Sequence, residues 1–328
     1  ITGQRVAVLS GARISADGGT GGGTVHVGGG WKGLDESLAN AQQTVVQANT
    51  QISANATANG NGGEVVVWAD GHTAVDSEVQ AKGGALGGNG GRVETSGKQS
   101  LAVNVAANTS AAQGEAGQWL IDPANLTIVD QIPQGGFNLE NSSQGPFFST
   151  DDISSTFSPT ESFLLNSTVV AGLENNGFVQ IYTTGTQPGD GNLTIAAPVL
   201  IDQNNSQSTG INPELFLEAK GEINIDAAVG LMSGQQVFDG FDLFLSYDIA
   251  KPVYVDAPLY LGNSGNLILS PYDTGTALPT NTMGQLPLDG VNLLSGMNTG
   301  SSGPLALNRI TVTGAVATDP VTQQSYIV

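Results

Sequence analysis

Three stretches of the chain carry residue types that hydrolyse polysaccharides. A hydrolase built on stacked strands needs a histidine in a glycine turn, a pair of aspartates and a basic strand. The stretches that approach this set are GHT at 71–73, DD at 151–152 and RIT at 309–311. The histidine precedes the aspartates, which is the wrong order, and Thr311 stands where a lysine is needed. We interpret the match as coincidence, assign no catalytic residue and predict that the chain is not an enzyme.

A polysaccharide lyase is disfavoured by charge. Its enolate-like transition state requires Arg or Lys beside an acidic calcium cluster. Beyond residue 130 the basic residues are Lys220, Lys251 and Arg309 alone. An acidic polymer would therefore be repelled.

Metal and phosphate sites are also weakly supported. His26 and His72 occur without any cysteine, which favours structural histidines over a zinc site. The turn QPGDGN at 187–192 suits calcium, but its one aspartate supplies too few ligands. Residues 91–98 are spaced one residue too far apart for a phosphate loop, and Gln99 stands where Ser or Thr should follow the lysine. We expect a turn there, and we predict no metal and no cofactor.

The aromatic residues are the candidates for binding. We expect a possible binding surface at Trp31, Phe147, Phe148 and Tyr272. The alternative is structural, because tryptophans often seal thin stacks of strands and a phenylalanine cluster can cap an apolar flank. The residues open to this alternative are Trp31, Trp68, Trp119, Phe137, Phe147, Phe148, Phe157 and Phe163.

The composition of the chain excludes some classes of binding partner. The 328 residues include 9 Lys and Arg against 29 Asp and Glu, a formal charge of −20, and no cysteine. Nucleic acid and anionic membrane surfaces both require basic residues, so neither is expected as a partner. No run of 18 apolar residues is present, so no membrane insertion is expected. The many glycines and the absence of long runs of helix formers predict an all-β chain.

The elements that must position any site are short strands separated by glycine turns. The pairs Gly22-Gly23, Gly62-Gly63 and Gly90-Gly91 each open a valine strand, and another strand precedes each pair at 13–16, 51–54 and 78–81. The pairs are 40 and 28 residues apart, so the first interval contains either two coils or one coil with an outward excursion at 31–40. Such repetition is typical of a solenoid.

The repeat returns after residue 177. IAAPV at 195–199, IDAAV at 225–229 and VDAPL at 255–259 recur every 30 residues. We predict that Ile195, Ile225 and Val255 stack in one interior ladder. We expect the strands that precede them to be 193–195, 215–217 and 243–245, with another at 267–269 and further strands at 310–316 and 325–328.

The chain divides into three parts on this basis. Residues 1–130 are coils, 131–178 are an irregular decorated section, and 179–328 are further coils with a loop-rich stretch at 271–308. Residues 162–173 fit either a brief helix or an edge strand. The predicted fold is a right-handed parallel β-helix, or β-solenoid, with irregular loop decorations.

Four motifs carry a family resemblance: GTVHVGGGWKG at 23–33, GGEVVVWADG at 62–71, GRVETSGK at 91–98 and WLIDPANLTI at 119–128. In order and spacing they resemble secreted filamentous-haemagglutinin-like exoproteins of two-partner secretion systems, over roughly residues 1–130. The resemblance implies a right-handed parallel β-helix, export through an outer-membrane two-partner secretion transporter, and an extracellular or bacterial cell-surface location.

The expected function is therefore an adhesin or scaffold. Its partners would be host-cell or matrix glycans or proteins, or copies of itself, bound by the decorations. Two alternatives stay open: a self-assembling subunit of a fibre or sheath, and a polysaccharide-active β-helix enzyme.

Overall fold

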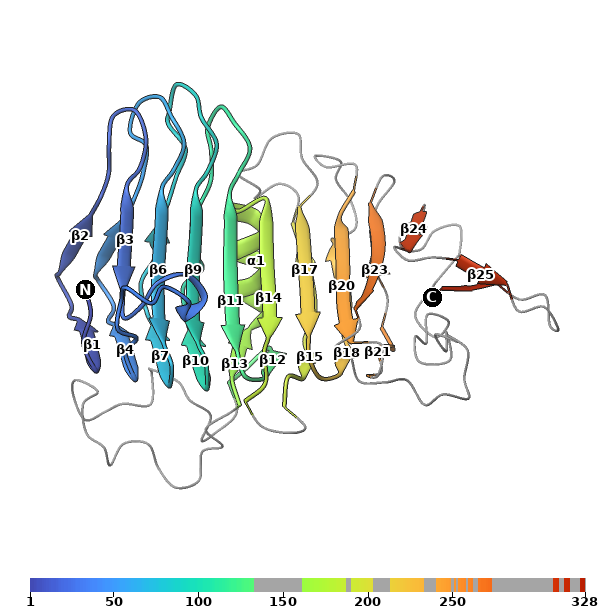
Figure 1. Ribbon diagram of the computed structural model, residues 1–328. Helices are drawn as coiled ribbons and strands as arrows, with labels where there is room; N and C mark the ends of the chain where they lie inside the picture. Colours follow the sequence, from blue (N-terminus) through green and yellow to red (C-terminus); the bar gives the residue numbers. More distant parts are fainter. Residues whose placement is uncertain are drawn as a thin grey trace.

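The computed structural model shows an all-β chain whose main sheets are parallel. It describes residues 1–132, 161–186, 190–202, 213–232, 240–248, 251, 253–257, 259–261 and 265–272, and the backbone of three strands between 309 and 327. Figure 1 shows an elongated stack in which equivalent strands of successive repeats lie side by side from the N-terminal end onward.

One sheet runs the length of the stack. It has nine strands in the order β24-β23-β20-β17-β14-β11-β9-β6-β3. Their bounds are β3 (Thr24–Val27), β6 (Glu64–Ala69), β9 (Arg92–Gly97), β11 (Gln118–Pro123), β14 (Phe178–Thr183), β17 (Glu214–Ala219), β20 (Asp242–Asp248), β23 (Asn266–Tyr272) and β24 (Arg309–Val312).

Shorter parallel sheets form the other sides of the stack. In the N-terminal half these contain β1 (Arg5–Val8), β4 (Gln43–Val46), β7 (His72–Val75) and β10 (Ser100–Val103), and β2 (Arg13–Ser15), β5 (Gln51–Ser53) and β8 (Val79–Gln80). In the C-terminal half they contain β13 (Phe163–Leu165), β12 (Leu126–Val129), β15 (Leu193–Ile195), β18 (Ile223–Ile225) and β21 (Val253–Val255), and β16 (Val199–Ile201), β19 (Val229–Leu231) and β22 (Leu259–Tyr260). An antiparallel pair, β25 (Val316–Thr318) and β26 (Ser325–Ile327), lies apart.

The chain visits three sheets in turn and then repeats. We call one such visit a passage; β3, β4 and β5 form one, and β6, β7 and β8 the next. Because β3 pairs directly with β6, the 40-residue interval is a single passage with an outward excursion. The expected strands at 13–16, 51–54 and 78–81 are confirmed as β2, β5 and β8, which pair in register.

Close backbone approach explains the paired glycines. A Cβ atom on Gly22 would lie 1.9 Å from the carbonyl oxygen of Ala54, and one on Gly62 would lie 2.1 Å from that of Ala81. At Gly90 the corresponding distance, to the Thr109 oxygen, is 1.8 Å. Real Cβ contacts are never so short, so each passage requires glycine at this step.

The predicted interior ladder is confirmed. Ile195 pairs with Ile225, and Ile225 with Val255, and all three side chains are buried. One assignment was wrong: the strand at 193–195 is not equivalent to 215–217. Leu193 pairs with Ile223, whereas Val179 in β14 occupies the position equivalent to Leu215. Apolar residues alternate in the same way in the sheet that contains β15 and in the sheet that contains β17. The local pattern therefore does not show which of the two sheets a strand joins.

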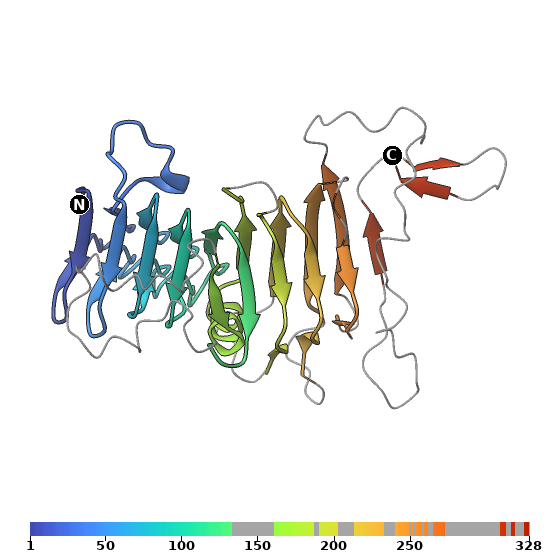
Figure 2. The same cartoon turned by 90° about the horizontal axis from the view of Figure 1, so that it is seen from below.

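A strand and a helix interrupt the repeat at its middle. β13 pairs with the N-terminal side of β12, out of chain order, and α1 (Asn166–Asn175) follows it. Residues 162–173 therefore contain both of the alternatives, an edge strand and a helix. Figure 1 shows α1 behind β11 and β14, and Figure 2 shows it from another side.

Helix α1 belongs to the core. Val169 and Leu173 are fully buried, and a Cβ on Gly172 would lie 2.5 Å from the ring of Trp119. Buried Asn176 ties the helix end to the preceding passage, because its Oδ1 accepts the Thr109 amide at 2.8 Å and its Nδ2 donates to the Ala107 carbonyl at 3.0 Å.

Much of the predicted decoration lies outside the described residues. This holds for 133–160 of the section 131–178, and for 273–308 of the loop-rich stretch 271–308. Within 91–98 the structure has strand β9, which confirms the valine strand expected after Gly90-Gly91 and takes the place of the turn that was the alternative to a phosphate loop.

Candidate functional site

A strap of residues 28–41 lies across the outer face of the nine-stranded sheet. It contains the short helix η1 (Trp31–Gly33), and the Ala41 amide closes its neck by donating to the Gly28 carbonyl at 2.6 Å. Lys32 has a φ of 54°, an uncommon left-handed conformation for a residue with a side chain. In Figure 1 the strap is the blue loop in front of β6 and β9, and in Figure 2 the same loop projects from one side of the stack near its N-terminal end.

The strap packs on Trp68. A Cβ on Gly33 would lie 2.5 Å from the Trp68 ring, and one on Gly29 would lie 2.6 Å from it, so only glycine allows this contact. The Trp68 indole donates to Asp70 at 3.1 Å, and Asn40 donates to the same Asp70 oxygen at 3.1 Å. Trp68 is thus an outward-facing residue that the strap buries.

Beneath the strap lies a buried carboxyl group. The Lys32 amide donates to Oε2 of Glu94 at 2.7 Å, and Glu94 is 0% exposed. Its Oε1 has no hydrogen-bond partner among the residues that the structure describes. Burial raises the pKa of Glu94 to about 8, against the opposing effect of the Lys32 amide. At neutral pH this group is therefore largely a neutral acid.

A second buried carboxyl group lies on the next strand. Asp122 is 3% exposed, and Thr184 donates to its Oδ1 at 3.3 Å. Burial raises the pKa of Asp122 to about 7, and the charge of Lys32 works against this shift. Burial also raises the pKa of Glu218, and the ammonium group of Lys32 lies 5.1 Å from the ring centre of Tyr182.

Raised carboxyl pKa values are typical of general acids, so Glu94 and Asp122 are candidates for that role. A general acid must reach the atom that it protonates. Glu94 and Asp122 are covered, and a polymer cannot contact them while the strap is in place. In this geometry Glu94 holds the strap by accepting the Lys32 amide.

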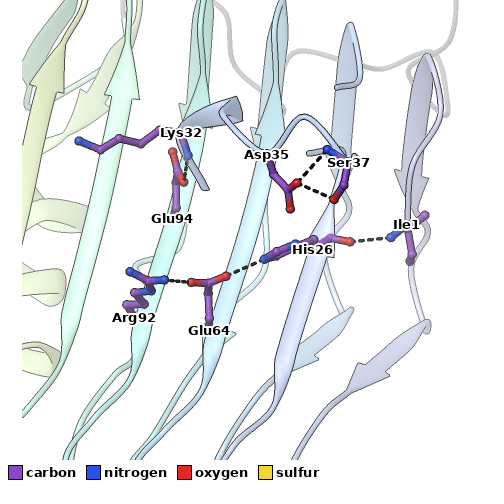
Figure 3. A network of polar contacts seen from close by, with 8 residues as sticks. All are labelled: Ile1, His26, Lys32, Asp35, Ser37, Glu64, Arg92 and Glu94. Atoms are coloured by element: carbon purple, nitrogen blue, oxygen red, sulfur yellow. Dashed lines mark hydrogen bonds and ion pairs between the residues drawn. The ribbon is translucent and has the colours of Figure 1, made fainter. Parts of the chain in front are cut away.

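A chain of charged contacts borders the strap, as Figure 3 shows. His26 Nε2 and Glu64 Oε1 are 2.6 Å apart, and the other Glu64 oxygen pairs with Arg92. The Arg92 guanidinium lies 4.5 Å from the ring centre of Trp31. Glu64 therefore has a side-chain partner at each of its carboxylate oxygens.

Arg92 and Glu64 also line an open groove of about 650 Å³. One wall is a row of outward positions in register on five neighbouring strands: Thr24, Glu64, Arg92, Gln118 and Phe178. The other wall is formed by the glycine steps with Asn61 and Ala116. The groove thus runs along the stack, across the strands.

A smaller hollow of about 300 Å³ surrounds His72. Amide side chains line it, among them Gln4, Gln42 and Gln99, together with Arg5. His72 Nδ1 is 2.6 Å from the Ser100 hydroxyl, and burial lowers the pKa of His72. Both histidines thus have side-chain partners, Glu64 at His26 and Ser100 at His72.

Of the predicted binding residues, Trp31 lies at the groove border and is half-buried. Trp119 is fully buried and donates to Thr95 at 2.9 Å, so it is a core residue. Phe147 and Phe148 lie outside the described residues, as does the side chain of Tyr272, which ends β23.

Sequence reasoning missed other outward aromatic residues. Phe216 and Phe244 stack with ring centres 5.7 Å apart, and Phe178 meets Phe216 edge-on at 6.0 Å. Because Phe216 and Phe244 turn their faces toward each other, this ladder supports the sheet rather than offering a flat platform. Glu94 and Asp122 were missed because their outward positions predict exposure, whereas contacts that are distant in sequence, the strap at Glu94 and Thr184 at Asp122, accompany their burial.

Comparison with known proteins assigns this chain to no family. No family model matches this chain, and no curated protein matches it. Within the described residues no group of acidic, histidine or cysteine side chains could hold a metal ion. None of their helices has the length and apolarity needed to cross a bilayer.

Proposed function

We propose that this chain is a right-handed parallel β-helix that acts outside the cell as an adhesin or scaffold. The fold part is supported by the parallel register of each passage on the next and by one apolar cluster that extends from Val6 to Leu269. Stacked passages of this kind form stiff rods whose outer faces are available for contact.

The observation that carries the functional part is the open groove along the stack. It offers charged, amide and aromatic groups in register over five strands, whereas the two buried carboxyl groups are closed to substrate. A surface of this kind can bind an extended partner through many weak contacts without chemical turnover.

Export is the second part of the proposal. The four motifs between residues 23 and 128 resemble two-partner secretion exoproteins, so an outer-membrane transporter of that class is the expected partner. Antibody labelling of intact producing cells, with and without the transporter, tests this part. Labelling that does not depend on the transporter would contradict it.

Binding is tested with the purified chain on host cells, extracellular matrix and immobilised glycans. We expect retention on at least one surface, and no release of reducing or unsaturated sugars from polysaccharides. Sugar release would establish the enzyme alternative. Filaments of variable length in electron micrographs, without retention on any surface, would favour the fibre or sheath alternative.

A further inference from the structure

The groove beside Arg92 has the properties of a ligand site. It is defined by Thr24, Glu64, Arg92, Gln118 and Phe178 on one wall and by the glycine steps with Asn61 and Ala116 on the other. The glycine wall carries almost no side chains, because the fold requires glycine at Gly22, Gly62 and Gly90. Among the residues that the structure describes, this wall therefore offers little obstruction to a linear ligand over several passages.

The backbone amides of the glycine wall already donate hydrogen bonds within the protein. The amides of Gly22, Gly62 and Gly90 donate to the carbonyls of Asn61, Asn89 and Glu115. The amides of the second glycines, Gly23, Gly63, Gly91 and Gly117, donate to the passage behind them. A peptide that binds by adding a strand needs unpaired backbone donors, and none of these glycines provides one.

The lining is neutral although the whole chain carries −20. The carboxylate in the lining, Glu64, already pairs with Arg92 and His26. A cationic peptide would find no unpaired carboxylate in the groove, and an acidic polymer would be repelled by the protein as a whole. The complementary ligand is thus uncharged and rich in hydroxyl groups.

The repeat length supports a sugar polymer. Five neighbouring strands at a spacing of about 4.8 Å give a groove of roughly 19 Å, room for about four extended pyranose rings. Each ring would then meet one passage. Gln118, whose Nε2 donates to Gln180 at 2.8 Å, keeps its carbonyl oxygen for a sugar hydroxyl, and Phe178 offers an apolar edge.

We propose that this groove binds a linear, uncharged oligosaccharide along the axis of the stack. This rests on the proposed adhesin function and names its ligand class. Arg92, Glu64, Gln118 and Asn61 bond to hydroxyl groups, and Phe178 and the Trp31 border contact the C–H faces of the rings.

The test is calorimetric titration of the whole chain with cellohexaose, chitohexaose and maltohexaose. Hexagalacturonate and decalysine serve as charged probes. We expect at least one neutral hexasaccharide to bind, and binding to weaken about tenfold or more in Gln118→Ala and in Phe178→Ala. Gln51→Ala and Tyr254→Ala are matched controls on other faces and should bind as the unmodified protein does.

Three results would overturn the proposal. These are binding of none of the neutral hexasaccharides, stronger binding of either charged probe, and neutral binding that survives both groove variants. Because Phe178 packs on Phe216, circular dichroism of each variant must match the parent, and Gln118→Ala alone decides if Phe178→Ala misfolds. If the protein adheres to cells equally with and without Gln118, the groove proposal fails while the adhesin proposal stands.

Discussion

At the scale of single residues, Glu94 is a carboxyl group in a place where a charge is costly. Its strand alternates inward Val93 and Thr95 with outward Glu94, so an exposed side chain is expected. The strap removes it from water and offers one backbone donor, from Lys32. One such bond does not offset the loss of hydration of a carboxylate, so the group keeps its proton.

This makes stability depend on pH. In the unfolded chain the pKa values of Glu94 and Asp122 return to 4.5 and 3.8, against about 8 and 7 in the fold. The folded protein binds more protons between these limits, so the free energy of unfolding falls as pH rises from about 4 and levels off above about 7 to 8, where both groups are ionised in the fold as well. Urea denaturation should show that the free energy of unfolding is lower by on the order of a few kcal/mol at about pH 9 than at about pH 6.

The matched control for this prediction is Glu94→Gln, which keeps an acceptor for the Lys32 amide and cannot ionise. It should lose less stability than the parent on going from the lower to the higher pH, and be the more stable of the two at the higher pH. Equal pH slopes for both proteins would show that the pKa of Glu94 is not raised in the folded protein.

At the scale of elements, the strap and α1 both depart from the repeat. Both cover apolar surface that a regular passage would leave bare. The strap covers the outer residue Trp68, and α1 covers the core residue Trp119 with Gly172 at the contact. Each uses glycine to bring its backbone onto an indole ring.

Removing the strap should expose Trp68 without unfolding the sheet. A variant with residues 29–40 replaced by two glycines should keep the pairing of β3 with β6, because all the paired residues of both strands lie outside the strap. We expect unchanged far-ultraviolet circular dichroism and stronger quenching of tryptophan fluorescence by iodide, although this variant also lacks Trp31. Leu34→Ser, at a strap position that is 76% exposed, is the control and should behave as the parent. Loss of β-structure would instead make the strap part of the fold.

A substitution in α1 should have the opposite effect to the one that helix propensity predicts. Alanine is a better helix former than glycine by about 1 kcal/mol. Gly172→Ala should nevertheless lower the melting temperature, because its Cβ would lie 2.5 Å from the Trp119 ring. Ser167→Ala on the exposed side of α1 is the control and should change it little. A higher melting temperature for Gly172→Ala would mean that the ring moves aside freely.

At the scale of the whole molecule, a single apolar core runs through the described passages. Inward valines such as Val25 and Val65 line it near the N-terminus, and larger residues such as Leu215 and Leu243 line it further along. Each passage therefore buries its apolar side chains on both neighbours, and damage to one rung affects the rungs beside it.

Ile225→Asp should be strongly destabilising for this reason. The carboxylate would be buried and unpaired between Ile195 and Val255, at a cost of about 3 kcal/mol or more. Asn224→Asp, on the outward side of the same strand, is the control and should cost much less. The measurement is the free energy of unfolding in urea. A cost no larger than that of the control would contradict the ladder.

The sequence by itself determined the strands beside the glycine steps, the glycine steps themselves and the ladder of Ile195, Ile225 and Val255. These follow from local alternation and from a repeat length, which need no knowledge of distant contacts. Only the tertiary structure decided which sheet each strand joins, as the strand at 193–195 shows, because an apolar alternation suits any sheet. It alone placed β13 beside β12 out of chain order, and it alone closed the strap over Glu94. Burial of an outward carboxyl group depends on a segment some 60 residues away, and local pattern carries no record of such a contact.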